Sequence, residues 1–218
     1  MQPPLPLLER LKTTIKRSKG NMDEVGMYKI LGAMPRLQSI VLGLDTSISS
    51  QHTEFWAQIR KSASERDPHL ADPYIVDSLI NSAVDEKLAM AIFRTISDAK
   101  PERSLPLERL EVCPGDDFGS DLTHFHLGWL DVIEHIERSW LVKRRYLGLG
   151  SDVLSVNQIR IDRVVRRIRL PKRLKEPPEL IFRRVWPVRP PLKGNWQQDW
   201  HSFPVEPETR QDSLVQCC

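Results

Sequence analysis

The chain has 218 residues, 40% of them hydrophobic and 28% charged, and a formal net charge of +3, so it is long enough to bury one good core. Its sequence holds no apolar run near the roughly 20 residues that span a bilayer, and its three cysteines make no disulfide framework. These features exclude a membrane-spanning or disulfide-stapled class and predict a cytoplasmic or nuclear location.

Charge is unevenly distributed along the sequence. Residues 141–193 hold fifteen Lys/Arg and four Asp/Glu, and the rest holds seventeen and twenty-five, so the formal charges are about +11 and −8. The two parts can neutralise each other within one fold, or the basic part can form a surface for an acidic partner.

Three short segments share an apolar-x-x-apolar spacing. Leu37–Leu42 and Leu107–Val112 end in a further apolar residue, whereas Leu8–Thr13 ends in threonine. This spacing is the strand phrase of a leucine-rich repeat, and the 29 positions from Leu8 to Leu37 match the upper end of that repeat length.

A helix is predicted between the first two phrases. Asp23 can cap it, Val25, Tyr28 and Leu31 recur at helical spacing, and Pro35 ends it. Because one strand and one helix cannot bury both of their apolar faces alone, we expect stacked copies to bury them together.

Alternation along the phrases predicts which side chains face away from the core. Ile40 and Leu42 point inward in such a strand, so their neighbours point outward. Outward residues of repeat strands are natural contacts for a partner protein. The candidates are Gln38, Val41, Glu108, Arg109 and Glu111.

Further helices are predicted between and after the phrases. Apolar residues recur at helical spacing from Ile75 to Ile96, and Pro101 closes that run. Another helix is expected from about Leu122 or Leu127 to Val142, with Trp140 on its buried face.

Beyond Gly148–Ser151 the sequence predicts an amphipathic basic helix that ends at Pro171, because Ile161, Val164 and Ile168 recur at helical spacing. The proline-rich stretch that follows it holds several tryptophans, so we expect it to pack on the domain. The basic patch consists of Arg160, Arg163, Arg166, Arg167, Arg169, Lys172, Arg173 and Lys175.

The predicted fold is α/β. Residues 1–147 are expected to form an irregular leucine-rich-repeat-like stack of parallel strands backed by helices. Residues 148–218 are expected to form the basic helix and a Pro/Trp-rich extension packed on that domain, with a flexible end.

Several phrases resemble the leucine-rich-repeat region of fungal F-box-type proteins. They are Met34-Pro-Arg-Leu-Gln-Ser-Ile40, Ser104-Leu-Pro-Leu-Glu-Arg-Leu110, Ser139-Trp-Leu-Val-Lys-Arg144, Phe182-Arg-Arg-Val-Trp-Pro187 and Asp199-Trp-His-Ser-Phe-Pro204. The resemblance implies a role in recognising substrates. A ubiquitin-ligase core is an expected partner only if an F-box lies upstream, since this sequence shows none. Lys16, Asp45 and Gly115 replace the repeat's usual Asn or Cys.

No catalytic, metal or cofactor site is predicted. His124 and His126 diverge at i, i+2 without a second ligand cluster, and no base is placed near Cys113 by spacing. We therefore expect a non-catalytic protein–protein interaction scaffold. The alternative is a nuclear or nucleic-acid-associated factor that uses residues 160–175, with weak binding because no nearby aromatic can stack on bases.

Overall fold

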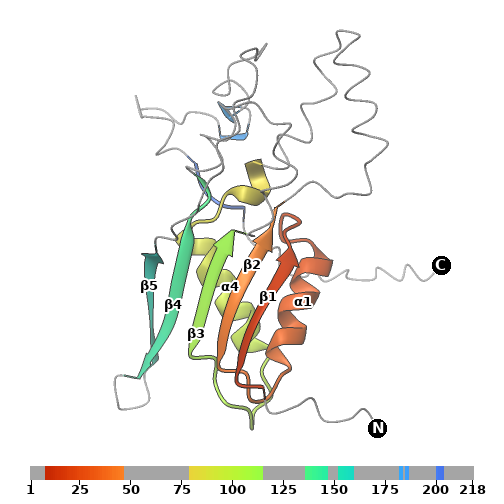
Figure 1. The fold of residues 1–218 in the computed structure, drawn as a ribbon, viewed down its shortest axis with the longest axis vertical. Helices are drawn as coiled ribbons and strands as arrows, with labels where there is room; N and C mark the ends of the chain where they lie inside the picture. Colours follow the sequence, from red (N-terminus) through yellow and green to blue (C-terminus); the bar gives the residue numbers. More distant parts are fainter. Residues whose placement is uncertain are drawn as a thin grey trace, which may run out of the picture.

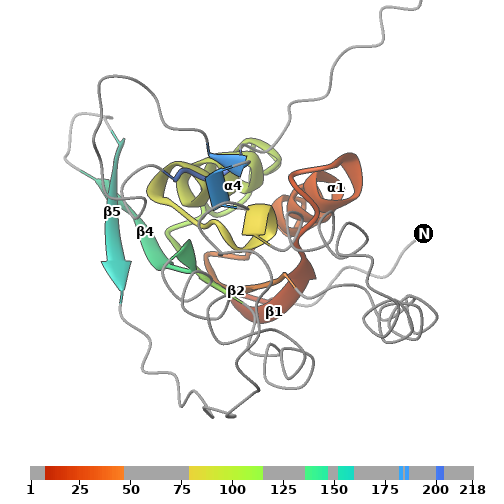
Figure 2. The ribbon, with the colours of Figure 1, turned by 90° about the horizontal axis from the view of Figure 1, so that it is seen from above.

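The computed structural model describes residues 8–46, 79–114, 136–146, 152–159, 182–183, 185–186 and 200–203. Five strands form one sheet, and α1 and α4 lie on the same face of it (Figures 1 and 2). In chain order the elements are β1 (Arg10–Lys16), α1 (Met22–Gly32), β2 (Ser39–Asp45), α4 (Glu86–Asp98), β3 (Arg109–Pro114), β4 (Ser139–Tyr146) and β5 (Asp152–Ile159).

The strands lie in the sheet in chain order, and the direction of pairing changes midway. β1, β2 and β3 are parallel, whereas β4 is antiparallel to β3 and β5 is antiparallel to β4. The α/β class predicted from the sequence is confirmed. The sheet is mixed, whereas the prediction was a stack of parallel strands.

The repeated apolar phrases occupy equivalent places in the three parallel strands. Leu11 pairs with Ile40, and Ile40 pairs with Leu110. Two residues further along each strand, Thr13, Leu42 and Val112 form the next row on the same face. The segments Leu37–Leu42 and Leu107–Val112 therefore lie edge to edge and in register, as their shared spacing predicts.

The core lies between the sheet and the two helices. Alternate strand residues such as Ile40, Leu42 and Leu110 are fully buried and pack with residues of α1 and α4. Large apolar side chains are buried on only one face of the sheet, and their burial determines which face turns toward the helices. The partners from the helices are Tyr28, Leu31, Leu88, Ala89, Ile92, Phe93 and Ile96.

The helix caps show why the helices begin where they do. The side chain of Asn21 accepts a hydrogen bond from the Glu24 N–H at 3.0 Å, so Asn21 caps α1, and the prediction of Asp23 was wrong by two residues. Asp23 instead lies in the first turn, where its negative charge interacts favourably with the positive end of the helix dipole. Asp85 caps α4 by accepting from Leu88 N–H at 2.9 Å.

The helix predicted to reach Val142 is wrong in its last part, because Ser139–Tyr146 is the strand β4. Trp140 and Val142 alternate toward the core and pair with β3, and this period of two prevails over the helical spacing. The indole N–H of Trp140 donates to Val84 O at 2.9 Å. The domain division predicted between residues 147 and 148 falls between β4 and β5, which pair directly.

Candidate partner-binding surface

The face of the sheet opposite the helices carries the strand residues that alternate with the core positions. Within the described residues, both helices lie on the other side of the sheet (Figure 2), so we call this surface the open face. It comprises Arg10, Lys12, Thr14, Lys16, Ser39, Val41, Gly43, Asp45, Arg109, Glu111, Cys113, Ser139, Leu141, Lys143, Arg145, Val153, Ser155, Asn157 and Ile159.

Basic residues outnumber acidic residues on the open face. Six are basic and two are acidic, which gives a formal charge of +4. Both acidic groups are paired on the same face: Arg109 Nη2 lies 2.9 Å from Glu111 Oε2, and Lys16 Nζ lies 3.5 Å from Asp45 Oδ2. The basic residues are Arg10, Lys12, Lys16, Arg109, Lys143 and Arg145.

Two of these cations stand directly across from each other. Arg109 of β3 pairs with Lys143 of the antiparallel strand β4, and both side chains are exposed. Like charges at opposed positions of an antiparallel pair destabilise it. The same row continues through Ser39 to Arg10, so the open face concentrates positive charge along one line of residues.

The predicted contact residues divide between two places. Val41, Arg109 and Glu111 lie on the open face, within β2 and β3. Gln38 and Glu108 instead precede those strands, where Gln38 O accepts hydrogen bonds from Glu108 N–H at 2.8 Å and Arg109 N–H at 3.0 Å. The structure therefore brings three of the five candidates together on one surface.

Sequence reasoning missed the basic residues that β4 contributes to this surface. Lys143 and Arg145 follow Val142, the predicted end of a helix, and the sequence predicts no strand there. The basic patch over residues 160–175 lies outside the described residues, as do His124 and His126.

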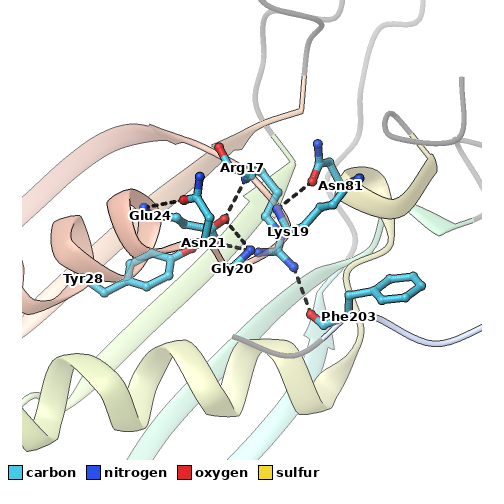
Figure 3. A network of polar contacts seen from close by, with 9 residues as sticks. Arg17, Lys19, Gly20, Asn21, Glu24, Tyr28, Asn81 and Phe203 are labelled. Carbon is cyan, nitrogen blue, oxygen red and sulfur yellow. Dashed lines mark hydrogen bonds and ion pairs between the residues drawn. The ribbon is translucent and has the colours of Figure 1, made fainter. Parts of the chain in front are cut away.

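A second polar cluster lies where β1 ends and α1 begins (Figure 3). Its centre is the buried carboxylate of Glu24. Arg17 Nη1 lies 2.6 Å from Glu24 Oε1, and both side chains are fully buried. The backbone N–H groups of Ser18 and Gly20 donate to Oε2 at 2.7 and 2.9 Å.

The turn between β1 and α1, which contributes backbone N–H groups to this cluster, contains two residues with positive φ, in the left-handed region. Lys19 and Gly20 have φ of 59° and 73°. Glycine adopts that region without cost, and Lys19 is held there because its N–H donates to Asn81 Oδ1 at 2.9 Å (Figure 3). A turn of this kind aims N–H groups at an anion, and here the protein's own Glu24 supplies that anion.

Tyr28 completes the cluster as a neutral donor. Its hydroxyl donates to Glu24 Oε1 at 2.7 Å. Burial raises the pKa of Tyr28 well above its ordinary value, and the negative charge of Glu24 raises it further. Because Glu24 is surrounded by donors from its own chain, the cluster is best interpreted as a structural clasp between β1 and α1.

Residues near the C-terminal end of the chain pack against the same end of the sheet. Phe203 O accepts from Arg17 Nη2 at 2.9 Å, and the backbone N–H of Ser202 donates to the α4-capping carboxylate of Asp85 at 3.0 Å. The buried ring of Trp186 donates from Nε1 to His201 O at 2.9 Å. These contacts place residues 200–203 beside the end of β1 and the start of α4.

Comparison of the chain with protein-family models, curated proteins and solved structures gives no match. Among the described residues, no group of histidine, cysteine, aspartate and glutamate could hold a metal ion, and no helix is long and apolar enough to cross a membrane.

Proposed function

We propose that the protein is a non-catalytic scaffold that binds an acidic segment of another protein through its open face. The observation that carries this proposal is the line of exposed cations on the sheet face opposite the two described helices, above all Arg109 opposite Lys143. That pair costs stability in the isolated protein, and an acidic partner would relieve the repulsion.

The local chemistry of the face supports binding over catalysis. Its two carboxylates already pair with neighbouring cations, and Cys113 is buried with its thiol 3.7 Å from Glu111 Oε1. A nucleophile needs access to its substrate, and the burial of Cys113 restricts that access. Exposed cations beside partly buried Val41 and Leu141 instead suit the rim and centre of a protein interface.

We further propose that β1–β3 form a leucine-rich-repeat-like unit of the kind that F-box-type proteins use to recognise substrates. Support comes from the equivalent register of the three phrases and from the helices, which lie behind the strands. The antiparallel strands β4 and β5 are not part of such a repeat. Under this proposal they widen the binding face.

Nucleic acid is the second candidate partner, because phosphates also favour a row of cations. The described residues of the open face include no aromatic side chain that could stack on a base. The smaller side chains Ser39, Val41 and Leu141 between the charges favour a polypeptide. We therefore place the acidic protein segment first.

The test is binding of a fluorescein-labelled peptide rich in aspartate and glutamate, measured by fluorescence anisotropy at moderate salt. The double variant Arg109→Glu/Lys143→Glu should weaken binding at least tenfold, about 1.4 kcal/mol. The matched control Lys87→Glu/Arg94→Glu reverses two exposed charges of α4 and should leave binding unchanged.

Two results would contradict the proposal. Equal loss of binding in both double variants would mean that net charge alone attracts the peptide. Tighter binding of single-stranded or duplex DNA than of the peptide, lost in the Arg109→Glu/Lys143→Glu protein, would assign the face to nucleic acid.

A further inference from the structure

Among the described residues, β1 is the edge strand of the sheet, and part of its backbone is directed away from β2. Arg17 N–H donates to Asp45 O at 2.8 Å, and Glu9 O accepts from Ser39 N–H at 3.0 Å, so the odd-numbered residues direct their backbone groups at β2. Since these groups alternate along a strand, Lys12 and Thr14 direct theirs away from β2. In the described part of the chain, β1 pairs with β2 alone.

Helix α1 leaves apolar side chains beside this edge. Met27 and Ile30 are 44% and 56% exposed, although they belong to a helix that packs on the sheet. A Cβ at Gly32 would meet Ala99, so that side of α1 faces α4. At about 100° per residue, Met27 and Ile30 lie roughly 140–160° around the helix from Gly32.

Met27 therefore lies away from α4 and next to Leu31, which packs in the core with Ile15 of β1. Figures 1 and 2 show α1 over the β1 end of the sheet. An element added beside β1 would meet Met27 and Ile30 on its helix side. On its other side it would meet the open-face cations.

The two sides of the β1 edge thus differ in chemistry. Arg10, Lys12 and Lys16 line the open-face side, whereas Met27 and Ile30 line the helix side. Successive residues of a strand point to opposite faces. A strand placed here would be matched on both sides only if acidic and apolar residues alternated along it.

We propose that the β1 edge takes an extended segment of the partner in which acidic and apolar residues alternate. Backbone groups of Lys12 and Thr14 pair with this segment, its acidic residues meet the cations of β1, and its apolar residues cover Met27 and Ile30. The proposal rests on the proposed function, since it specifies how the acidic partner docks.

A second copy of this chain fits the edge poorly. Its own β1 carries Arg10, Lys12 and Lys16 on the corresponding face, so a paired β1 would bring cations against cations. Lysines on an edge strand are a known way of opposing such self-association. Charge complementarity therefore selects an acidic strand from another protein.

The experiment compares two labelled peptides of equal composition by fluorescence anisotropy. One alternates glutamate and valine, and the other has its glutamates and valines in separate blocks. The alternating peptide should bind about tenfold more tightly, as expected for a few additional backbone hydrogen bonds. Thr14→Pro removes an outward N–H without touching the β1–β2 ladder and should abolish that difference.

Side-chain variants test the helix side of the edge. Met27→Glu should weaken binding of the alternating peptide, whereas the control Met22→Glu, at the 56% exposed first residue of α1, should not. Unchanged thermal melting would show that each variant folds. The double variant Arg109→Glu/Lys143→Glu tests the proposed function independently.

Each outcome decides between the two proposals. Preference for the alternating peptide that Thr14→Pro and Met27→Glu remove supports the edge site. Equal affinity for the two peptides, lost only in Arg109→Glu/Lys143→Glu, overturns the edge site and keeps the proposed function. If the alternating peptide still binds Arg109→Glu/Lys143→Glu with unchanged affinity, the edge site holds and the cations of β3 and β4 take no part in binding. If neither peptide binds, the edge site and the proposed function are both overturned.

Discussion

The two faces of the sheet obey different rules. On the helix side, Ile40, Leu42 and Leu110 are fully buried, and packing leaves little freedom in what they can be. On the open face, Arg109 and Lys143 oppose each other without any packing reason. One face of the sheet therefore stabilises the fold, while the other carries charges that the fold does not need.

The largest difference is expected between the buried and the exposed ion pair. Glu24→Ala leaves Arg17 buried without its partner and should cost about 3–5 kcal/mol of unfolding free energy. Glu111→Ala on the open face should cost no more than about 1 kcal/mol. Urea denaturation measures both, and equal losses would contradict the structural role of the Glu24 clasp.

Adjacent residues of β2 give the next comparison. Leu42→Ala removes a fully buried side chain and should cost about 2–5 kcal/mol. Val41→Ala, one position away on the open face, should cost less than about 1 kcal/mol. Denaturant titration of the two variants would reveal a wrong assignment of faces if Val41→Ala were the more damaging.

Tyr28 predicts a dependence of stability on alkaline pH. Because its pKa is raised in the folded protein, the unfolded chain loses the hydroxyl proton first. The stability from this group is complete below the ordinary tyrosine pKa of about 10 and is lost as the pH rises above it. Tyr28→Phe should flatten that loss in denaturation series at alkaline pH, whereas Tyr146→Phe, at a 58% exposed site, should not.

The smallest expected effect is an increase in stability. Lys143→Thr removes the like charge opposite Arg109 and should raise the unfolding free energy by about 0.2–1 kcal/mol. The same change should weaken binding of the acidic peptide, so stability and binding move in opposite directions. A variant that lost both would show that Lys143 has a structural role.

The spacing of apolar residues predicted those strands whose buried positions follow a regular alternation. The spacing of Leu37, Ile40 and Leu42, repeated at Leu107, predicted two neighbouring parallel strands, because each phrase buries the same alternate positions. The first residues of β4, up to Val142, are predicted as the end of a helix because their apolar residues continue a helical spacing. The pairing of β4 with β3, which local spacing does not reveal, shows that they form a strand.

The remaining features depend on contacts between distant residues. The row from Arg10 to Lys143 exists only once the strand register is known. The Ser202–Asp85 contact joins residues 117 positions apart, and no local pattern predicts it. Glu24 was visible in the sequence only as a charge in a helix, since its burial beside Arg17 follows from the turn through Lys19 and Gly20.

Carbodiimide cross-linking of the acidic peptide to the full chain, with mass spectrometry of the joined fragments, tests whether the peptide binds the open face. The reagent joins carboxylates to nearby lysines, so it reports which face the peptide occupies. We expect cross-links at Lys143 and Lys12, both exposed on the open face. Cross-links confined to Lys87 of α4, or to Lys172 and Lys175 of the basic segment, would contradict it.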